Sequence, residues 1–425
     1  MKIFQELLER GLPAQFTNNA ELETMLNNGG ERIYIGFDAT AKSLHVGHLL
    51  QLIVLKRLQK AGHIPILLLG GGTTMVGDPS GRSDMRQMLD NDDIAKNNEC
   101  FKRQFERFID FSEGKALIVN NADWLLNQSY LPFLCDIGAH FSINQMLSAE
   151  CYKQRMEKGL SYLELSYQVM QAFDFLVLND KYSCRLQLGG NDQWSNILAG
   201  VDLVRKKRKK TVYGMTFNLL TTSEGAKMGK TQKGTIWLDA EMTSPYELFQ
   251  YFRNVDDKDV VKCLKFLTFL PLGEIREMER WSCERINETK KILAYEVTKL
   301  VHGEAIAQNV LVSSEQIFSG RGENNGMPTT EIEVDKSLNI IDILLAIKFV
   351  PTKSEGRRMI QGGGIYMNDR RVDDFDLMIN PADFLSDDII IRKGKKYYHK
   401  VKLIPTVFDF KKQSEYKQQK VVATL

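Results

Sequence analysis

The 425-residue sequence has little of what marks a secreted, membrane-spanning or zinc-dependent protein. Its six cysteines are scattered with no Cys-x-x-Cys pair, which argues against a disulfide framework and against a zinc site. No apolar run reaches the length that crosses a bilayer, and the first residues lack the apolar core of a secretory leader. We therefore predict a protein of the reducing cytoplasm, with no membrane association and no protein-held metal.

Net charge is also nearly absent, since the formal charge at pH 7 is only +2. The charge is unevenly distributed, however. Residues 337–425 carry 16 Lys+Arg against 11 Asp+Glu, a net +5, which leaves a net −3 on the other 336 residues. A basic C-terminal part on a mildly acidic body is the arrangement expected of an appended nucleic-acid-binding module.

The first 243 residues alternate short apolar runs with helical patterns, which is typical of a parallel α/β sheet. Glycine-rich or polar turns follow several of the runs. Ligands of open α/β sheets bind beyond the carboxyl ends of the strands, so these turns should meet at one crevice. The expected strands are Arg32–Phe37, Ile64–Leu69, Ala116–Val119, Arg185–Leu188 and Val212–Leu219, and helical patterns begin near Gly47, Ser83, Leu131, Ser161 and Asn191.

The pattern changes further along the chain. The pattern of residues 244–318 is wholly helical. It begins with Ser244-Pro245, which is a favourable pair for a helix cap and the first turn. Residues 319–336 are rich in Gly, Asn, Pro and Thr, which is typical of a linker. We predict a Rossmann-like α/β domain over 1–243, a helical domain over 244–318, this linker, and a small α+β domain over 337–425.

The segment His45-Val46-Gly47-His48 places two imidazoles at the N-terminus of an expected helix. Backbone N–H groups and the helix dipole make such a position an anion site. The imidazoles add directed donors where phosphate charge would develop, and Gly47 lets a ligand approach the backbone. A His pair at this spacing is elsewhere a metal-ligand pair or a plain helix start, so by itself it is a moderate signal.

A second segment, Lys227-Met228-Gly229-Lys230-Thr231, puts two lysines three residues apart in a glycine-containing loop. It suits a mobile flap whose ammonium groups close on a polyphosphate. In this order the two segments resemble the HIGH and KMSKS signatures of class I aminoacyl-tRNA synthetases. The resemblance implies that the catalytic groups are His45, His48, Lys227, Lys230 and Thr231, assisted by Arg82 and Arg86.

A polar stripe is the next informative feature, because Tyr167, Gln171 and Asp174 share one face of an otherwise apolar helical pattern. A buried polar group without a partner costs about 1–3 kcal/mol, so such a stripe needs partners or a ligand. On the pattern alone, an ordinary surface stripe is slightly favoured. The stripe is similar to the amino-acid pocket of tyrosyl-tRNA synthetases. That resemblance implies that Tyr34 and Asp174 hold a tyrosine phenol, and that Tyr167, Gln171 and Asp78 hold its ammonium.

Residues in further turns would complete the site. By the same resemblance, Gly190 and Asp192 contact the ATP ribose and Gln193 lies near the tyrosine, although a plain Asp helix cap is equally compatible. Arg82 and Arg86 lie one helical turn apart and could reach pyrophosphate, or simply form a solvated helix face. The full set of implied ATP contacts is Asp38, Thr40, Gly47, Gly190, Asp192 and Lys230.

The C-terminal pattern from Pro351 to Asn368 resembles the ribosomal-S-four-type RNA-binding domain. Basic helices of this kind contact phosphates with little sequence readout. The implied RNA-binding residues are Lys348, Lys353, Arg357, Arg358 and Arg371.

These resemblances cover nearly the whole chain and imply a tyrosine–tRNA ligase of bacterial or organellar type. Such an enzyme attaches L-tyrosine to tRNA(Tyr) in two steps through a tyrosyl-adenylate, with ATP and Mg²⁺, and is expected to act as a cytoplasmic homodimer.

Three alternatives stay open. A tryptophanyl-tRNA synthetase shares the fold and both signatures, but Tyr34 and Asp174 suit a phenol better than an indole. A nucleotidyltransferase would not need the RNA module or the helical domain. An RNA-binding protein with a silent catalytic fold would not need both complete signatures.

Overall fold

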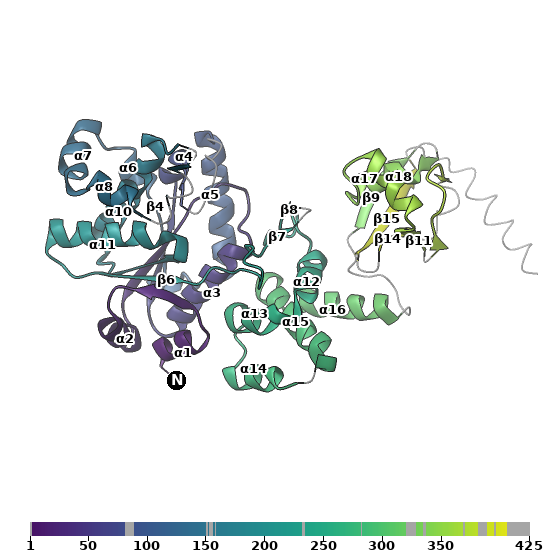
Figure 1. The fold of residues 1–425 in the computed structure, drawn as a ribbon, viewed down its shortest axis with the longest axis horizontal. Coiled ribbons are helices and arrows are strands. Elements are labelled where there is room, and N and C mark those ends of the chain that lie inside the picture. Colours follow the sequence, from purple (N-terminus) through teal and green to yellow (C-terminus); the bar gives the residue numbers. More distant parts are fainter. Residues whose placement is uncertain are drawn as a thin grey trace, which may run out of the picture. The chain divides into compact units, whose positions relative to one another are not determined.

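The computed structural model describes residues 2–80, 89–149, 152, 156–157, 159–231, 234–281, 283–319, 329–334, 337–368, 370–380, 389–394 and 397–405. It divides into two compact units, Met1–Ala307 and Gln308–Leu425 (Figure 1). Within the described residues, every helix is too short or too polar to span a bilayer. Each unit has a sheet and a core of its own.

The first unit is built on a six-stranded sheet with the order β1-β6-β5-β2-β3-β4. Five neighbouring strands run parallel, while β1 pairs antiparallel with β6 at the edge. The strand order reverses at β2, because β3 and β4 follow on one side of it and β5 and β6 on the other. Such a switch point is where an open α/β sheet binds ligands. The strands are β1 (Pro13–Phe16), β2 (Arg32–Phe37), β3 (Ile64–Leu69), β4 (Leu117–Asn120), β5 (Leu186–Gly190) and β6 (Tyr213–Phe217).

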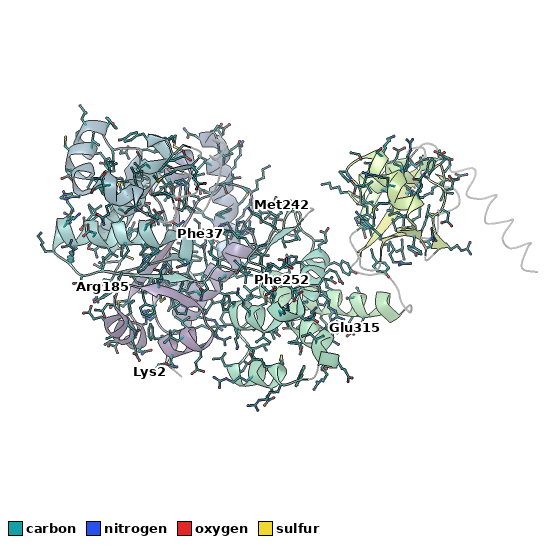
Figure 2. The ribbon with its side chains drawn as sticks, in the orientation of Figure 1. Lys2, Phe37, Arg185, Met242, Phe252 and Glu315 are labelled. Carbon is teal, nitrogen blue, oxygen red and sulfur yellow. The ribbon has the colours of Figure 1, made fainter. Side chains whose placement is uncertain are left out.

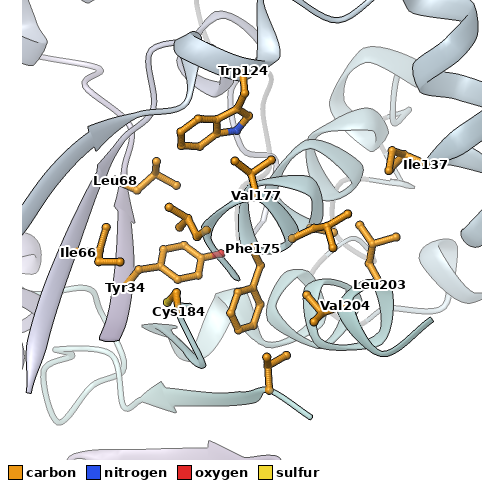
Figure 3. Close-up of a cluster of buried hydrophobic side chains, with 14 residues drawn as sticks. Tyr34, Ile66, Leu68, Trp124, Ile137, Phe175, Val177, Cys184, Leu203 and Val204 are labelled. Atoms are coloured by element: carbon orange, nitrogen blue, oxygen red, sulfur yellow. The ribbon is translucent and has the colours of Figure 1, made fainter. Parts of the chain in front are cut away.

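Helices cover both faces of this sheet (Figure 1). Tyr34 points from β2 towards α10 (Tyr162–Tyr182) and α11 (Trp194–Arg208), where it packs with Phe175 and Val204 in one buried cluster (Figure 3). Side chains alternate along a strand, so Phe37 faces the opposite way. Its ring lies 4.8 Å from that of Phe105, at the end of α5 (Asn91–Phe105), and 6.0 Å from that of His48 in α3 (Val46–Lys60).

Shorter elements complete the sheet part of the unit. They include the antiparallel pair of β7 (Lys230–Thr231) and β8 (Gly234–Thr235). β7 is the end of the second signature segment. The remaining helices are α1 (Ile3–Glu9), α2 (Asn19–Asn28), α4 (Thr73–Val76), α6 (Ala122–Leu125), α7 (Tyr130–Asp136) and α8 (Ile143–Leu147).

The chain becomes helical after residue 244, as its pattern predicts. Ser244 caps α12 by accepting a hydrogen bond from the Glu247 amide, and Pro245 occupies the first turn. Phe252 on this helix is fully buried among the helices, as Phe37 is in the sheet part (Figure 2). The helices are α12 (Pro245–Arg253), α13 (Val260–Leu267), α14 (Leu272–Glu279), α15 (Ile286–His302) and α16 (Glu304–Ser319).

The second unit contains a five-stranded sheet with the order β12-β11-β14-β15-β9 and two helices that share its apolar core. β9 pairs in parallel with β15 and lies inside the segment 319–336, whose composition predicts a linker. The first half of that segment is rich in Gly and Asn. The second half, Thr-Thr-Glu-Ile-Glu-Val, alternates polar and apolar residues as a strand does, but the composition of the whole segment does not show this. The elements are β9 (Thr329–Val334), β10 (Leu338–Asn339), α17 (Ile340–Ala346), α18 (Lys353–Gln361), β11 (Ile365–Met367), β12 (Arg370–Arg371), β13 (Met378–Ile379), β14 (Ile389–Lys393) and β15 (Tyr397–Pro405).

A buried arginine joins the sheet part of the first unit to its helical part. Arg57 on α3 donates to Glu6 of α1 at 2.5 Å and to the carbonyl of Thr268, and its guanidinium lies 4.5 Å from the centre of the Phe269 ring. Burial lowers the pKa of Arg57 to about 10, so the group is still charged at neutral pH. Removing one partner of a buried ion pair is costly because the other partner keeps its desolvation penalty.

We expect Arg57→Met to lower the free energy of unfolding of the first unit by about 3 kcal/mol, the cost of breaking a buried pair. All four tryptophans lie in this unit, so urea unfolding followed by tryptophan fluorescence reports on it. The matched control is Arg276→Met, which removes a surface pair with Glu9 and should change the free energy by less than about 1 kcal/mol. Equal losses in the two variants would contradict this role of Arg57.

Candidate active site

A cavity of about 310 Å³ lies at the carboxyl ends of the parallel strands. Each of the five strands contributes its last residue or the residue that follows it: Asp38, Gly70, Asn121, Gly190 and Asn218. Most of the predicted catalytic, tyrosine-binding and ATP-binding residues line this cavity. Its lining includes Tyr34, Asp38, Thr40, His45, Gly47, His48, Asp78, Tyr167, Gln171, Asp174, Gly190, Asp192, Gln193, Lys227 and Lys230.

Among the described residues, one predicted catalytic residue lies outside that lining. Thr231 follows Lys230 in β7 but is not among the residues that line the cavity. Arg82 and Arg86 fall within residues 81–88, outside the described part of the chain.

The two imidazoles cap the N-terminus of α3. Nδ1 of His45 accepts a hydrogen bond from the Gly47 amide at 3.0 Å, and Nδ1 of His48 accepts one from the His45 amide at 3.2 Å. The rings stack with their centres 3.8 Å apart. A nitrogen that accepts a backbone hydrogen bond carries no proton, so the proton of each neutral ring lies on Nε2. Both rings line the cavity and can therefore act there as Nε2–H donors.

The second signature segment contacts the first directly. Gly229 has a φ of +84°, and a Cβ on it would lie 3.0 Å from Cβ of Val46, so only glycine fits this position. The amide of Val46 donates to the carbonyl of Ile236, just after the β7–β8 hairpin. Lys227 lies 3.3 Å from the carboxylate of Asp192. The backbone between the two lysines thus packs against the helix terminus that carries the imidazoles.

Asp174 is the most deeply buried carboxylate of the cavity. It accepts hydrogen bonds from Nδ2 of Asn121 at 3.0 Å and from Nε1 of Trp124 at 2.7 Å. Burial raises its pKa to about 7, even though these two donors favour the charged form. Burial, with the nearby Asp174 charge, also raises the pKa of Tyr34 well above its ordinary value. The Tyr34 hydroxyl is buried and has no hydrogen-bond partner among the described residues.

Two further carboxylates are held by the polar stripe and the turns. Asp38 accepts hydrogen bonds from the hydroxyl of Tyr167 and from Oγ1 of Thr73, both at 2.8 Å. Nε2 of Gln193 donates to Asp78 at 2.6 Å. Asp38, which the resemblance places with ATP, shares a hydrogen-bonded network with Tyr167. The cavity therefore has a negative wall that suits an ammonium group.

Some residues of the site were not found from the sequence. Asn121 and Trp124 contact Asp174, which lies about fifty positions away in the sequence, and no periodicity marks them. Gln187 could have been recognised as a candidate site residue, because it is a polar residue inside the apolar strand β5. Its Oε1 is buried and has no partner among the described residues. Among those residues there is also no group of three or more His, Cys, Asp or Glu side chains that could hold a metal ion.

The nominated RNA-binding residues are all exposed on the second unit. Lys353 begins α18 and lies 2.8 Å from Asp342, and Arg371 lies 2.7 Å from Asp373. Arg371 also packs against the glycine turn, since a Cβ on Gly363 would lie 2.5 Å from its Cζ. The five side chains come from α18, from β12 and from the turn after α17: Lys348, Lys353, Arg357, Arg358 and Arg371.

The chain is similar to known proteins over nearly its whole length. Residues 26–319 match the family described as tRNA synthetases class I (W and Y), and residues 321–401 match the tyrosine–tRNA ligase SYY-like C-terminal domain. A tyrosine–tRNA ligase of Acetivibrio thermocellus is 55% identical over 95% of this chain and 99% of its own length. A tyrosine–tRNA ligase 1 of Clostridium acetobutylicum is 54% identical over 94% and 98%.

Solved structures agree. A truncated mitochondrial tyrosyl-tRNA synthetase of Aspergillus nidulans has a TM-score of 0.65 at 32% identity, covering 75% of this chain and 94% of that one. A tryptophanyl-tRNA synthetase of Encephalitozoon cuniculi, at 14% identity and a TM-score of 0.55, shares the fold alone. The predicted class I synthetase fold with a C-terminal domain is confirmed, and this chain belongs to the tyrosine–tRNA ligase family of class I tRNA synthetases.

Proposed function

We propose that this protein attaches L-tyrosine to tRNA(Tyr) in two steps through a tyrosyl-adenylate. ATP enters as its Mg²⁺ complex and is a substrate of the first step. The observation that carries this proposal is the buried hydroxyl of Tyr34, which has no partner among the described residues and lies beside Asp174 in the cavity. An unpaired buried hydroxyl is costly, and a ligand that pairs with it recovers that cost.

A tyrosine phenol satisfies both side chains at once. Its hydroxyl donates to the Asp174 carboxylate and accepts from the hydroxyl of Tyr34. Phenylalanine leaves the Tyr34 hydroxyl without a partner and offers no donor to Asp174. An indole N–H can donate to Asp174, but it has no acceptor for Tyr34. The pair therefore favours tyrosine over both competitors, since a site built to hydrogen-bond a hydroxyl rejects analogues without one.

The ammonium group of the substrate is held at the negative wall. Asp78, Tyr167 and Gln171 are its contacts, and Gln193 orients Asp78 through their hydrogen bond. With both ends of tyrosine fixed, its carboxylate is free to face the phosphates. Orientation of this kind contributes much of the rate acceleration of a two-substrate reaction.

In the first step a carboxylate oxygen of tyrosine attacks the α-phosphorus of ATP. The bond to the bridging oxygen breaks, and pyrophosphate leaves. Nε2–H groups of His45 and His48 and the ammonium groups of Lys227 and Lys230 stabilise the charge that develops on the phosphates, assisted by Thr231, Arg82 and Arg86. Gly47, Gly190, Asp192, Thr40 and Asp38 form the rest of the ATP site. When Lys227 turns to the phosphates, its partner Asp192 becomes an acceptor for ribose hydroxyls.

In the second step a terminal ribose hydroxyl of tRNA attacks the carbonyl of the mixed anhydride, and AMP leaves. Lys348, Lys353, Arg357, Arg358 and Arg371 of the second unit bind tRNA phosphates. Their exposure and their clustering on α18, β12 and the turn after α17 support this role. No side chain acts as a covalent nucleophile in either step.

We also propose that the protein acts as a cytoplasmic homodimer. The exposed apolar side chains of α7 and its surroundings support a protein interface. Tyr130 is 64% exposed and Leu131 67%, and Leu126, Leu134 and Ile143 add further apolar surface. Contiguous exposed apolar surface of this kind is typical of protein–protein contacts.

Truncating an imidazole should slow activation without weakening tyrosine binding. We expect His45→Ala to lower kcat of tyrosine-dependent ATP–pyrophosphate exchange roughly 100-fold or more, as loss of one preorganised donor does, with the KM for tyrosine unchanged. His140→Ala is the control, because His140 does not line the cavity, and should keep the full rate. A parallel loss of tyrosine affinity in His45→Ala would contradict the assigned role.

The raised pKa of Asp174 predicts how tyrosine binding depends on pH. Below about pH 7 the ligand-free carboxyl is protonated, and a phenol donor selects the ionised form, so binding releases a proton. The affinity for tyrosine should therefore rise about tenfold from pH 6 to pH 8 and then level off. Equilibrium dialysis with labelled tyrosine measures this. Asp174→Asn should bind weakly and without this pH dependence, and a wild-type affinity that stays flat or falls would contradict the account.

A further inference from the structure

The helical part of the first unit holds the catalytic loop in place. We call residues 221–231 the lysine loop. Its Ser223 amide donates to the carboxylate of Asp259 at 3.1 Å, and its Thr221 carbonyl accepts from Lys262 at 2.9 Å. Asp259 and Lys262 belong to the segment that leads into and forms α13. The loop is therefore tied at its beginning to the helices and not only to the sheet.

A second pair of contacts holds the loop between its two lysines. The sulfur of Met228 is buried 3.8 Å from that of Cys263 on α13. The amide of Gly229 donates to the hydroxyl of Tyr251 on α12 at 2.7 Å, the shortest of these tethers. Lys227 and Lys230 lie on either side of this anchored pair. Both lysine side chains are exposed, whereas Met228 and Gly229 are buried.

Gly229 is the point at which three parts of the site meet. Its carbonyl accepts from the Ile236 amide at 2.8 Å, its Cα lies against Val46 of α3, and its amide reaches Tyr251. It lies two residues after one catalytic lysine and one residue before the other. Any displacement of Gly229 would move both ammonium groups relative to the imidazoles.

We propose that Tyr251 is a positioning residue for amino-acid activation. Through its hydroxyl it fixes Gly229, so that Lys227 and Lys230 meet the triphosphate in the geometry that the transition state requires. The inference rests on the proposed function and deepens it, because it makes the helical part a working component of the active site. Displacements of about an ångström at a reacting centre are enough to lower a rate.

The hydroxyl of Tyr251 can be separated from its ring. The ring packs against Phe252, with centres 5.1 Å apart, and phenylalanine would preserve that contact. Burial raises the pKa of Tyr251, which keeps the hydroxyl neutral at physiological pH. Tyr251→Phe therefore removes the acceptor for the Gly229 amide and little else.

The first experiment measures tyrosine-dependent ATP–pyrophosphate exchange. We expect Tyr251→Phe to lower kcat about 3- to 10-fold, the equivalent of one hydrogen bond, with the KM for tyrosine unchanged. The matched control is Tyr295→Phe, which removes the hydroxyl bond from Tyr295 to Glu304 at the surface of α15 and should leave exchange unaltered. A raised KM for tyrosine in Tyr251→Phe, or an unchanged kcat, would overturn the proposal.

The second experiment asks whether the effect passes through the lysines. Single-turnover formation of labelled tyrosyl-adenylate, in which slow rates remain measurable, is compared with and without Tyr251→Phe in a Lys227→Ala/Lys230→Ala background. There we expect less than a twofold effect, because nothing remains to be positioned. An equal loss in both backgrounds would overturn the role of Tyr251 alone. A wild-type protein without tyrosine-dependent exchange would overturn the proposed function, and this inference with it.

Discussion

The first unit is arranged around one buried carboxylate. A buried Asp174 is tolerable only where donors meet it, and the turn after β4 and the short helix α6 supply Asn121 and Trp124 for that purpose. α10 packs closely on the sheet and brings the carboxylate to these donors. The same packing brings it near the hydroxyl of Tyr34, which has no hydrogen-bond partner among the described residues. Burial still leaves the pKa of Asp174 at about 7. The fold thus keeps a partly satisfied acceptor in the cavity, and we propose that this acceptor makes the cavity selective for a phenol.

The residues proposed to bind phosphate are arranged differently from the buried Asp174. His45 and His48 are fixed by hydrogen bonds to the backbone that they cap, whereas Lys227 and Lys230 are exposed and long. The site combines two donors fixed by backbone hydrogen bonds with two exposed cations whose backbone is anchored at Gly229. Preorganised donors stabilise charge without reorganisation, and exposed ammonium groups can exchange one anionic partner for another. The ion pair between Lys227 and Asp192 shows such an alternative partner.

Much of this arrangement could be predicted from the sequence, for identifiable reasons. β2 and β3 have the predicted bounds because each is a continuous apolar run buried within the sheet. The edge strand β1 is too short to show a pattern, and β9 was hidden by the Gly- and Asn-rich residues before it. The signature segments could be found because each is a short continuous run of residues, and their imidazoles and lysines line the cavity. Asn121, Trp124 and Tyr251 could not be found, since each acts through tertiary contacts that leave no periodic trace.

The central claim is that the pocket of Tyr34 and Asp174 admits tyrosine for activation by ATP. The most direct test is exchange of labelled pyrophosphate into ATP by the full chain, with tyrosine, tryptophan or phenylalanine supplied in turn. The account predicts exchange with tyrosine and only background with the other two, because an indole offers no acceptor to Tyr34 and a phenyl ring offers neither an acceptor to Tyr34 nor a donor to Asp174. Exchange driven by tryptophan or phenylalanine as well as by tyrosine, or no exchange at all, would contradict it.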